Sequence, residues 1–129
     1  MPVSMEVREN GWVIYFVFID PWTMQEIAPV IEQDRNYRDQ SPHPVHAVLN
    51  LSAAKHLPPG AISLRHASPD LNHPTAGQVV LVGTNTFVRN VAELIFRLSR
   101  TDKFKIFATE EEAWAYLRKV IAEAPQSKG

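Results

Sequence analysis

Five histidines are the residues of this chain that could bind a metal ion or act as general bases. His43 and His46 have an i,i+3 spacing that could bring two imidazoles to one metal, and His56, His66 and His73 lie in later connections. No carboxylate or cysteine completes a recognisable third-ligand motif, and Pro44 favours an extended link between the first two. We therefore interpret the histidines as loop residues and predict neither a metal site nor a cofactor.

Two serines could act as nucleophiles beside histidines, Ser52 near His56 and Ser63 near His66. A hydrolase of the Gly-x-Ser-x-Gly type needs a strained turn around the serine and an acid that orients the histidine, and neither pattern is present. An enzyme that uses the histidines stays open as a third hypothesis. The sequence favours a protein that is not an enzyme.

A possible anion site begins at Gly83, where an apolar run ends and a helix begins. Thr84 and Asn85 stand at the N-terminus of that helix, and open α/β sheets bind anions at such places because free backbone N–H groups point outward. A single glycine is not a phosphate-loop fingerprint, so a plain turn with a helix cap is the interpretation we favour. If a ligand binds at this edge, Ser52, Lys55 and His56 should lie beside it.

Basic residues gather around a short predicted helix from Pro59 to His66. Lys55, His56, Arg65 and His66 form this group, which we interpret as a solvated face, with an acidic protein partner as the alternative. The candidate ligand-binding or partner-binding residues are Ser52, Lys55, His56, Arg65, His66, Thr84 and Asn85.

The elements that must position these residues are clearest between 78 and 120. Val79 to Val82 is a fully apolar run typical of a strand buried on both faces. The following helix has a buried stripe with a period of about 3.6 residues, and its members are Phe87, Val88, Val91, Ala92, Leu94, Ile95 and Leu98. Residues 103 to 107 alternate as an edge strand does, and Thr109 with Glu112 predicts a capping box for the last helix.

The first half of the chain predicts a hairpin, a helix and a third strand. Asn10-Gly11 between two strand-like segments is a strong hairpin signal, since both residues accept a positive φ. Thr23 and Glu26 predict a capping box for a helix from about 23 to 39, with a kink at Pro29. Val45 to Leu51 reads as the third strand, and a long connection reaches Gly77.

These elements predict a single α/β domain over residues 1–124, followed by a disordered tail over 125–129. The expected order is strand, strand, helix, strand, short helix, strand, helix, strand, helix. The five-stranded sheet should be mixed, with an N-terminal antiparallel hairpin, parallel later strands and about four helices.

Composition restricts the partners and the compartment. The chain has 129 residues, no cysteine and a formal net charge of −1, so it offers no disulfide, no thiolate chemistry and no basic footprint for nucleic acid. No apolar run has the roughly 18 to 20 residues of a membrane span, and the first residues lack a signal-peptide pattern. We expect a cytoplasmic protein.

The closing segment, Phe107 to Leu117, and the strand end at Asn50-Leu51-Ser52 give the chain a family resemblance. Together with the order of elements, they resemble the STAS domain of bacterial anti-sigma-factor antagonists. The resemblance implies a non-catalytic regulatory or protein-interaction module. The family's phosphorylated Ser or Thr cannot be carried over, because Leu57-Pro58-Pro59-Gly60 stands at that turn.

A related branch of that family looks like lipid-transfer domains of the CRAL-TRIO type. This resemblance allows an alternative function, the binding of a small apolar ligand or lipid between the sheet and the 59–77 connection. The residues do not decide between this ligand and a protein partner. A homodimer through a strand edge is also open, at 3–8 or at 103–107.

Overall fold

The structure is a computed structural model that describes residues 2–61, 63, 73–98 and 103–124. Its elements are β1 (Val3–Arg8), the 3-10 turn η1 (Glu9–Gly11), β2 (Val13–Ile19), α1 (Met24–Asp39), β3 (Val45–Ala53), β4 (Ala76–Val82), α3 (Thr86–Leu98), β5 (Phe104–Phe107) and α4 (Glu110–Glu123). The expected short helix from Pro59 to His66 lies largely outside the described residues, as does the predicted tail over 125–129.

The five strands form one sheet in the order β1-β2-β3-β4-β5. β1 and β2 are antiparallel, and each later neighbour is parallel to the one before, as the sequence predicts. The hairpin is confirmed, with positive φ at Asn10 and Gly11, although η1 makes its connection longer than a two-residue turn. β1 and β5 form the edges of the sheet.

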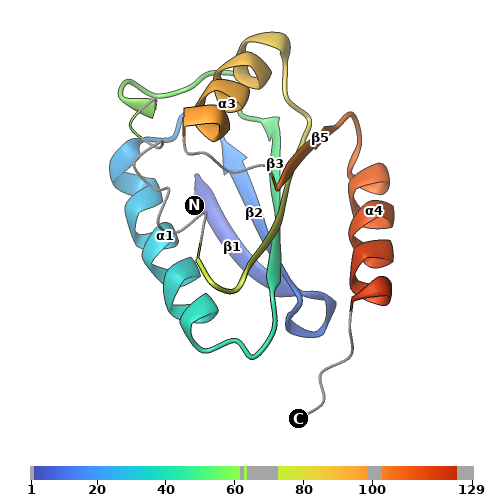
Figure 1. The fold of residues 1–129 in the computed structure, drawn as a ribbon. Coiled ribbons are helices and arrows are strands. Elements are labelled where there is room, and N and C mark those ends of the chain that lie inside the picture. Colours follow the sequence, from blue (N-terminus) through green and yellow to red (C-terminus); the bar gives the residue numbers. More distant parts are fainter. Residues whose placement is uncertain (1, 62, 64–72, 99–102, 125–129) are drawn as a thin grey trace.

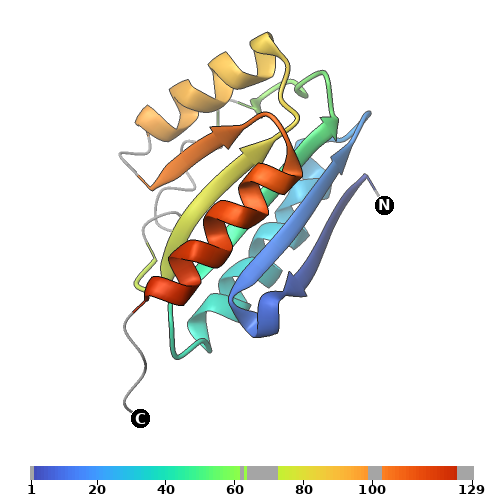
Figure 2. The ribbon, with the colours of Figure 1, turned by 90° about the vertical axis from the view of Figure 1, so that its right-hand side faces the viewer.

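Helices cover both faces of the sheet. α1 and α3 lie on one face and α4 lies on the other (Figure 1). The view in Figure 2 shows α4 running along the strands, with α1 behind the sheet. Alternation along each strand divides the apolar residues between these faces, so that Phe16 and Phe18 face α1 while Tyr15 faces α4.

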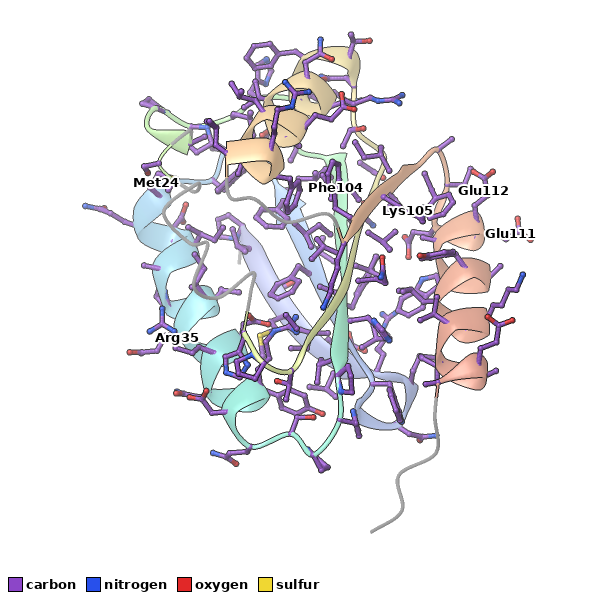
Figure 3. All side chains as sticks on the ribbon, in the orientation of Figure 1. Met24, Arg35, Phe104, Lys105, Glu111 and Glu112 are labelled. Carbon is purple, nitrogen blue, oxygen red and sulfur yellow. The ribbon has the colours of Figure 1, made fainter. Side chains whose placement is uncertain are left out.

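Both predicted capping boxes are present. Thr23 and Glu26 exchange side-chain and backbone hydrogen bonds at the start of α1, and Thr109 and Glu112 do the same at the start of α4. α1 continues through Pro29 to Asp39. Glu111 and Glu112 lie on the outward side of α4 (Figure 3), where solvent and the positive helix end both favour carboxylates.

The buried stripe predicted for α3 is partly wrong. Val88 and Ile95 are buried, but Phe87, Leu94 and Leu98 are exposed by 61%, 41% and 49%. Phe96, which the predicted stripe leaves out, is buried and stacks on Phe104 of the edge strand with ring centroids 4.7 Å apart. The sheet-facing side of α3 is therefore rotated toward Phe96, because β5 supplies its aromatic partner there.

Candidate functional site

An apolar cavity lies on the sheet face that α1 and α3 cover. Its volume is about 190 Å³. Asp34 and Arg38 are the charged side chains among the described residues that line it, and nearly all the others are apolar. The described lining residues are Phe16, Phe18, Trp22, Ile27, Val30, Ile31, Asp34, Arg38, Ala47, Leu49, Leu51, Leu57, Ala76, Gly77, Val79, Leu81, Val88, Ala92, Ile95 and Phe96.

Leu49 marks the cavity in the burial pattern of the sheet. It lies on the central strand β3, paired to Phe16 of β2 and Leu81 of β4. A leucine at such a position is normally fully buried, yet Leu49 is only half-buried. Its remaining surface is explained by the cavity that it lines.

Trp22 closes the cavity near the start of α1. The residue is 5% exposed, and its ring meets Phe18 edge-on with centroids 5.0 Å apart. Its indole Nε1 is buried and donates no hydrogen bond to any described residue. A buried N–H without a partner costs about 1 to 3 kcal/mol, so this N–H lowers the stability of the fold at this end of the cavity.

The predicted rim residues do meet at the carboxyl edge of the parallel strands. The Lys55 N–H donates to Oδ2 of Asp20 at 2.7 Å, and Asn85 Nδ2 donates to the Lys55 carbonyl at 2.9 Å. Asn85 also accepts from the N–H of Val88 at 2.8 Å, as the cap of α3. Both ends of this amide are thus engaged within the fold.

Asp20 connects this rim to His56. Nδ1 of His56 lies 3.3 Å from Oδ2 of Asp20, while the imidazole remains largely exposed. Desolvation alone would raise the pKa of the Asp20 carboxyl, but the hydrogen bonds from Lys55 and His56 outweigh it, and the pKa is lowered. The rim therefore carries a carboxylate beside the predicted basic group.

The remaining predicted site residues divide into two sets. Ser52 is exposed and packs against Gly83, and Thr84 is half-buried at the same edge. Arg65 and His66 lie outside the described residues.

A surface hollow at this rim lies next to the cavity. Asp20 and His56 line the hollow together with Pro58 and Met24. Trp22 and Leu57 line both the hollow and the cavity, so these two side chains form the wall between them.

The described histidines do not converge on one site. The His43 ring stacks on Trp12 at 3.8 Å, and His73 Nε2 lies 2.6 Å from Oδ1 of Asp39. His46 is not a loop residue, because it lies in β3, within the predicted third strand, and is 5% exposed. Within the described ranges, no group of three or more His, Asp or Glu side chains could hold a metal ion.

His46 has a structural environment. Its Nδ1 accepts a hydrogen bond from the N–H of Gln78 at 2.9 Å, so the proton of the neutral ring is on Nε2. Burial, followed by repulsion from Arg38 and His43, lowers the pKa of His46 to about 4.

Neither serine forms a nucleophile pair among the described contacts. Ser63 Oγ donates to the Gly60 carbonyl at 2.7 Å, and the Ser52 N–H donates to Oδ1 of Asn50 at 2.9 Å.

A second polar group, on the α4 face, was not predicted. Asn50 Nδ2 donates to the Tyr15 hydroxyl at 2.9 Å and to Oε2 of Glu110 at 3.0 Å, and Trp114 Nε1 donates to Oε1 of Glu110 at 3.1 Å. The Arg8 guanidinium lies over the Tyr15 ring, 4.1 Å from its centroid. Burial raises the pKa of the Tyr15 hydroxyl, and the Glu110 charge adds to the shift. These contacts fasten the first turn of α4 to the sheet.

Sequence reasoning placed interest at the rim and missed the cavity. The signal in the sequence that could have pointed to the cavity is Asp34, a polar residue among the apolar positions of the inward face of α1, which pairs with Arg38 at the cavity wall. Among the helices in the described ranges, none has both the length and the hydrophobicity needed to cross a bilayer.

No protein-family model matches the chain, and no curated protein matches it.

Proposed function

We propose that this protein binds a small apolar ligand, without catalysing a reaction, in the cavity between the sheet and helices α1 and α3. The observation that carries the proposal is the apolar lining of a partly open cavity of about 190 Å³ in a small domain. An apolar cavity of about 150 Å³ is large enough to hold benzene. The space here suits a ligand of at least that size.

The free-energy cost of leaving the cavity empty supports the proposal that a ligand fills it. Protein interiors are close-packed and contain few voids larger than a water molecule. At about 24 cal/mol per Å³, a fully enclosed empty cavity of this volume would cost roughly 4 to 5 kcal/mol, and this is an upper limit here because the cavity is partly open. Even a part of that cost is a sizeable fraction of the stability of a small domain, which is about 5 to 15 kcal/mol. A ligand that fills the cavity would recover much of it.

The position of the proposed site differs from the expectation drawn from the sequence. The resemblance to lipid-transfer domains allowed a site between the sheet and the 59–77 connection. The described lining residues support a site under α1 and α3, to which that connection contributes Ala76 and Gly77.

Native mass spectrometry of gently purified protein tests the proposal. We expect a bound apolar molecule, or a rise in melting temperature when a panel of apolar ligands and lipids is added. An apo mass together with an unchanged melting temperature across the panel would contradict it.

A matched pair of variants locates the binding. Ala92 lines the cavity from α3, while Ala122 is exposed on α4, and both are helical. Ala92→Leu should weaken ligand binding at least tenfold because its side chain occupies the space, and Ala122→Leu should leave binding unchanged. Equal affinities in the two variants would place the ligand elsewhere.

A second candidate is a STAS-type interaction module, as the sequence resemblance suggests. The exposed apolar residues of α3, namely Phe87, Leu94 and Leu98, favour it, because they form one stripe at helical spacing. Recovery of one partner by the wild type, and its loss in a Phe87→Ser, Leu94→Ser double variant, would support this function.

With this second candidate we also propose a cytoplasmic location and a homodimer that forms through the edge of β1 or β5. Sedimentation at several protein concentrations tests the dimer.

A further inference from the structure

Arg38 gives the cavity a polar end. The side chain lies near the C-terminus of α1 and is only 5% exposed. Its Nε donates to both oxygens of Asp34, at 3.0 and 3.1 Å. Its Nη1 donates to the Val45 carbonyl and, at 3.5 Å, to the Thr75 carbonyl. These contacts fix the guanidinium between α1 and the beginnings of β3 and β4.

The second amino group of this guanidinium, Nη2, makes no such contact with a described residue. A guanidinium carries five N–H donors, and no hydrogen bond from Nη2 to a described residue is present. Among the described residues, the side-chain polar atom that is both buried and without a hydrogen-bond partner is Trp22 Nε1. Nη2 of Arg38 is not such an atom. The group is therefore accessible, and Arg38 lines the cavity.

Residues near both ends of α1 line the cavity. Trp22 lines it just before the helix begins, and Arg38 lines it in the last turn. From Met24, the first residue of α1, to Arg38, fourteen steps of about 1.5 Å separate the backbone positions by roughly 21 Å. Between them the helix contributes Ile27, Val30 and Ile31, which are apolar. A ligand that follows this path is elongated, and a polar group on it meets a donor at the Arg38 end.

We propose that the cavity takes an elongated apolar molecule with a hydrogen-bond-accepting oxygen at one end, and that Nη2 of Arg38 binds this oxygen. The inference rests on the proposed function, since it names the class of ligand for the same cavity. Alcohols, carboxylic acids and esters of long-chain hydrocarbons share the required chemistry. A hydrogen bond to a charged donor in an apolar wall is stronger than one between neutral groups, so the oxygen determines which end of the ligand enters this region.

Calorimetric titration of the wild type with decanol, decanoic acid and chlorodecane tests this inference. Water solvates the hydroxyl better than the chlorine, so a purely apolar cavity would prefer chlorodecane. We expect at least one of the oxygen-headed ligands to bind about tenfold more tightly than chlorodecane. The comparison of decanol with decanoic acid shows whether the preferred head is neutral or anionic.

Arg38→Lys is the matched variant, because it keeps the positive charge and removes Nη2. The preference for an oxygen head should disappear, while the affinity for chlorodecane stays the same and shows that the cavity is intact. Trp22→Phe is the control for the opposite end and should keep the preference. If Arg38→Lys does not fold, the Nη2 hydrogens of the wild type decide instead. They should exchange slowly in isotope-edited spectra with decanol and not with chlorodecane.

The outcomes separate the two proposals. If no ligand of the series binds, the proposed function fails, and this inference fails with it. If chlorodecane binds as tightly as both oxygen-headed ligands, or if the preference persists in Arg38→Lys or disappears in Trp22→Phe, the apolar site stands and the role of Arg38 is overturned.

Discussion

The backbone of Gly77 lies directly against the imidazole of His46. A Cβ on Gly77 would stand 2.8 Å from Cε1 of the ring and closer still to Nδ1. The next residue, Gln78, donates its N–H to the same Nδ1 at 2.9 Å. The start of β4 therefore fits around an imidazole that accepts a hydrogen bond, and a proton on Nδ1 would abolish that bond.

This relationship predicts a stability that depends on pH between about 6.5 and 4. The pKa of His46 falls from 6.5 to about 4 in the folded protein, so the unfolded chain binds more protons in this range. The free energy of unfolding should thus be fully present above pH 6.5 and should decrease as pH falls, by about 3 kcal/mol at most. Urea denaturation at pH 7, 5.5 and 4 measures it.

His46→Gln provides the control for the pH dependence. The glutamine amide can accept from the N–H of Gln78 but does not titrate. The variant should lose the His46 part of the pH dependence, whatever its stability at pH 7. A slope identical to that of the wild type would mean that other groups cause it.

Gly83 and Gly60 form a second test, because both have positive φ, +75° and +86°. A Cβ at Gly83 would lie 2.8 Å from both N and Cα of Ser52, whereas one at Gly60 would lie 3.8 Å from Cγ of Met24. Gly60→Ala should therefore cost only the backbone strain, about 1 to 2 kcal/mol. Gly83→Ala should cost about 2 kcal/mol more, since backbone atoms cannot move aside. Equal losses in urea denaturation would contradict the close approach of β3 to Gly83.

The sequence predicted the fold well because its local signals agree with its packing. Thr23 and Thr109 cap helices with the predicted capping boxes, and Asn10-Gly11 lies in the connection of a hairpin between the two predicted strands. Errors arose where tertiary contacts decide. Phe87 and Phe96 both fit an apolar helix pattern, and only the position of Phe104 on β5 selects Phe96 for burial.

The cavity could not be predicted for a related reason. Periodicity tells which side chains face a layer but not how closely the two layers approach. Leu49, Val79 and Ala92 read as ordinary core residues, and nothing in their types shows that a space remains between them. The proximity of the rim residues could be predicted from the sequence, because the carboxyl ends of parallel strands meet at the same edge of a sheet.

Filling the cavity should stabilise the protein. Ala92→Leu adds apolar atoms beside an existing void, so the unfolding free energy should rise by about 1 kcal/mol if the leucine adopts an unstrained rotamer. Ala122→Leu, on the exposed side of α4, should change it by less than about 0.5 kcal/mol. Thermal unfolding of both proteins without ligand measures the difference. A lower melting temperature for Ala92→Leu would mean that the space is too narrow for a side chain.

Trp22 and Trp114 allow the same substitution to be compared with and without a hydrogen bond. Both are buried in apolar clusters, but Nε1 of Trp114 donates to Glu110 at 3.1 Å and Nε1 of Trp22 has no partner among the described residues. Trp→Phe removes the same atoms at each position. At Trp114 it also leaves a Glu110 oxygen without its donor, while at Trp22 it relieves an unpaired N–H. Trp114→Phe should therefore be more destabilising than Trp22→Phe by about 1 to 3 kcal/mol in urea denaturation. Equal losses would mean that Trp22 Nε1 does have a hydrogen-bond partner in solution, and the cavity would then contain an ordered water or a ligand at that end.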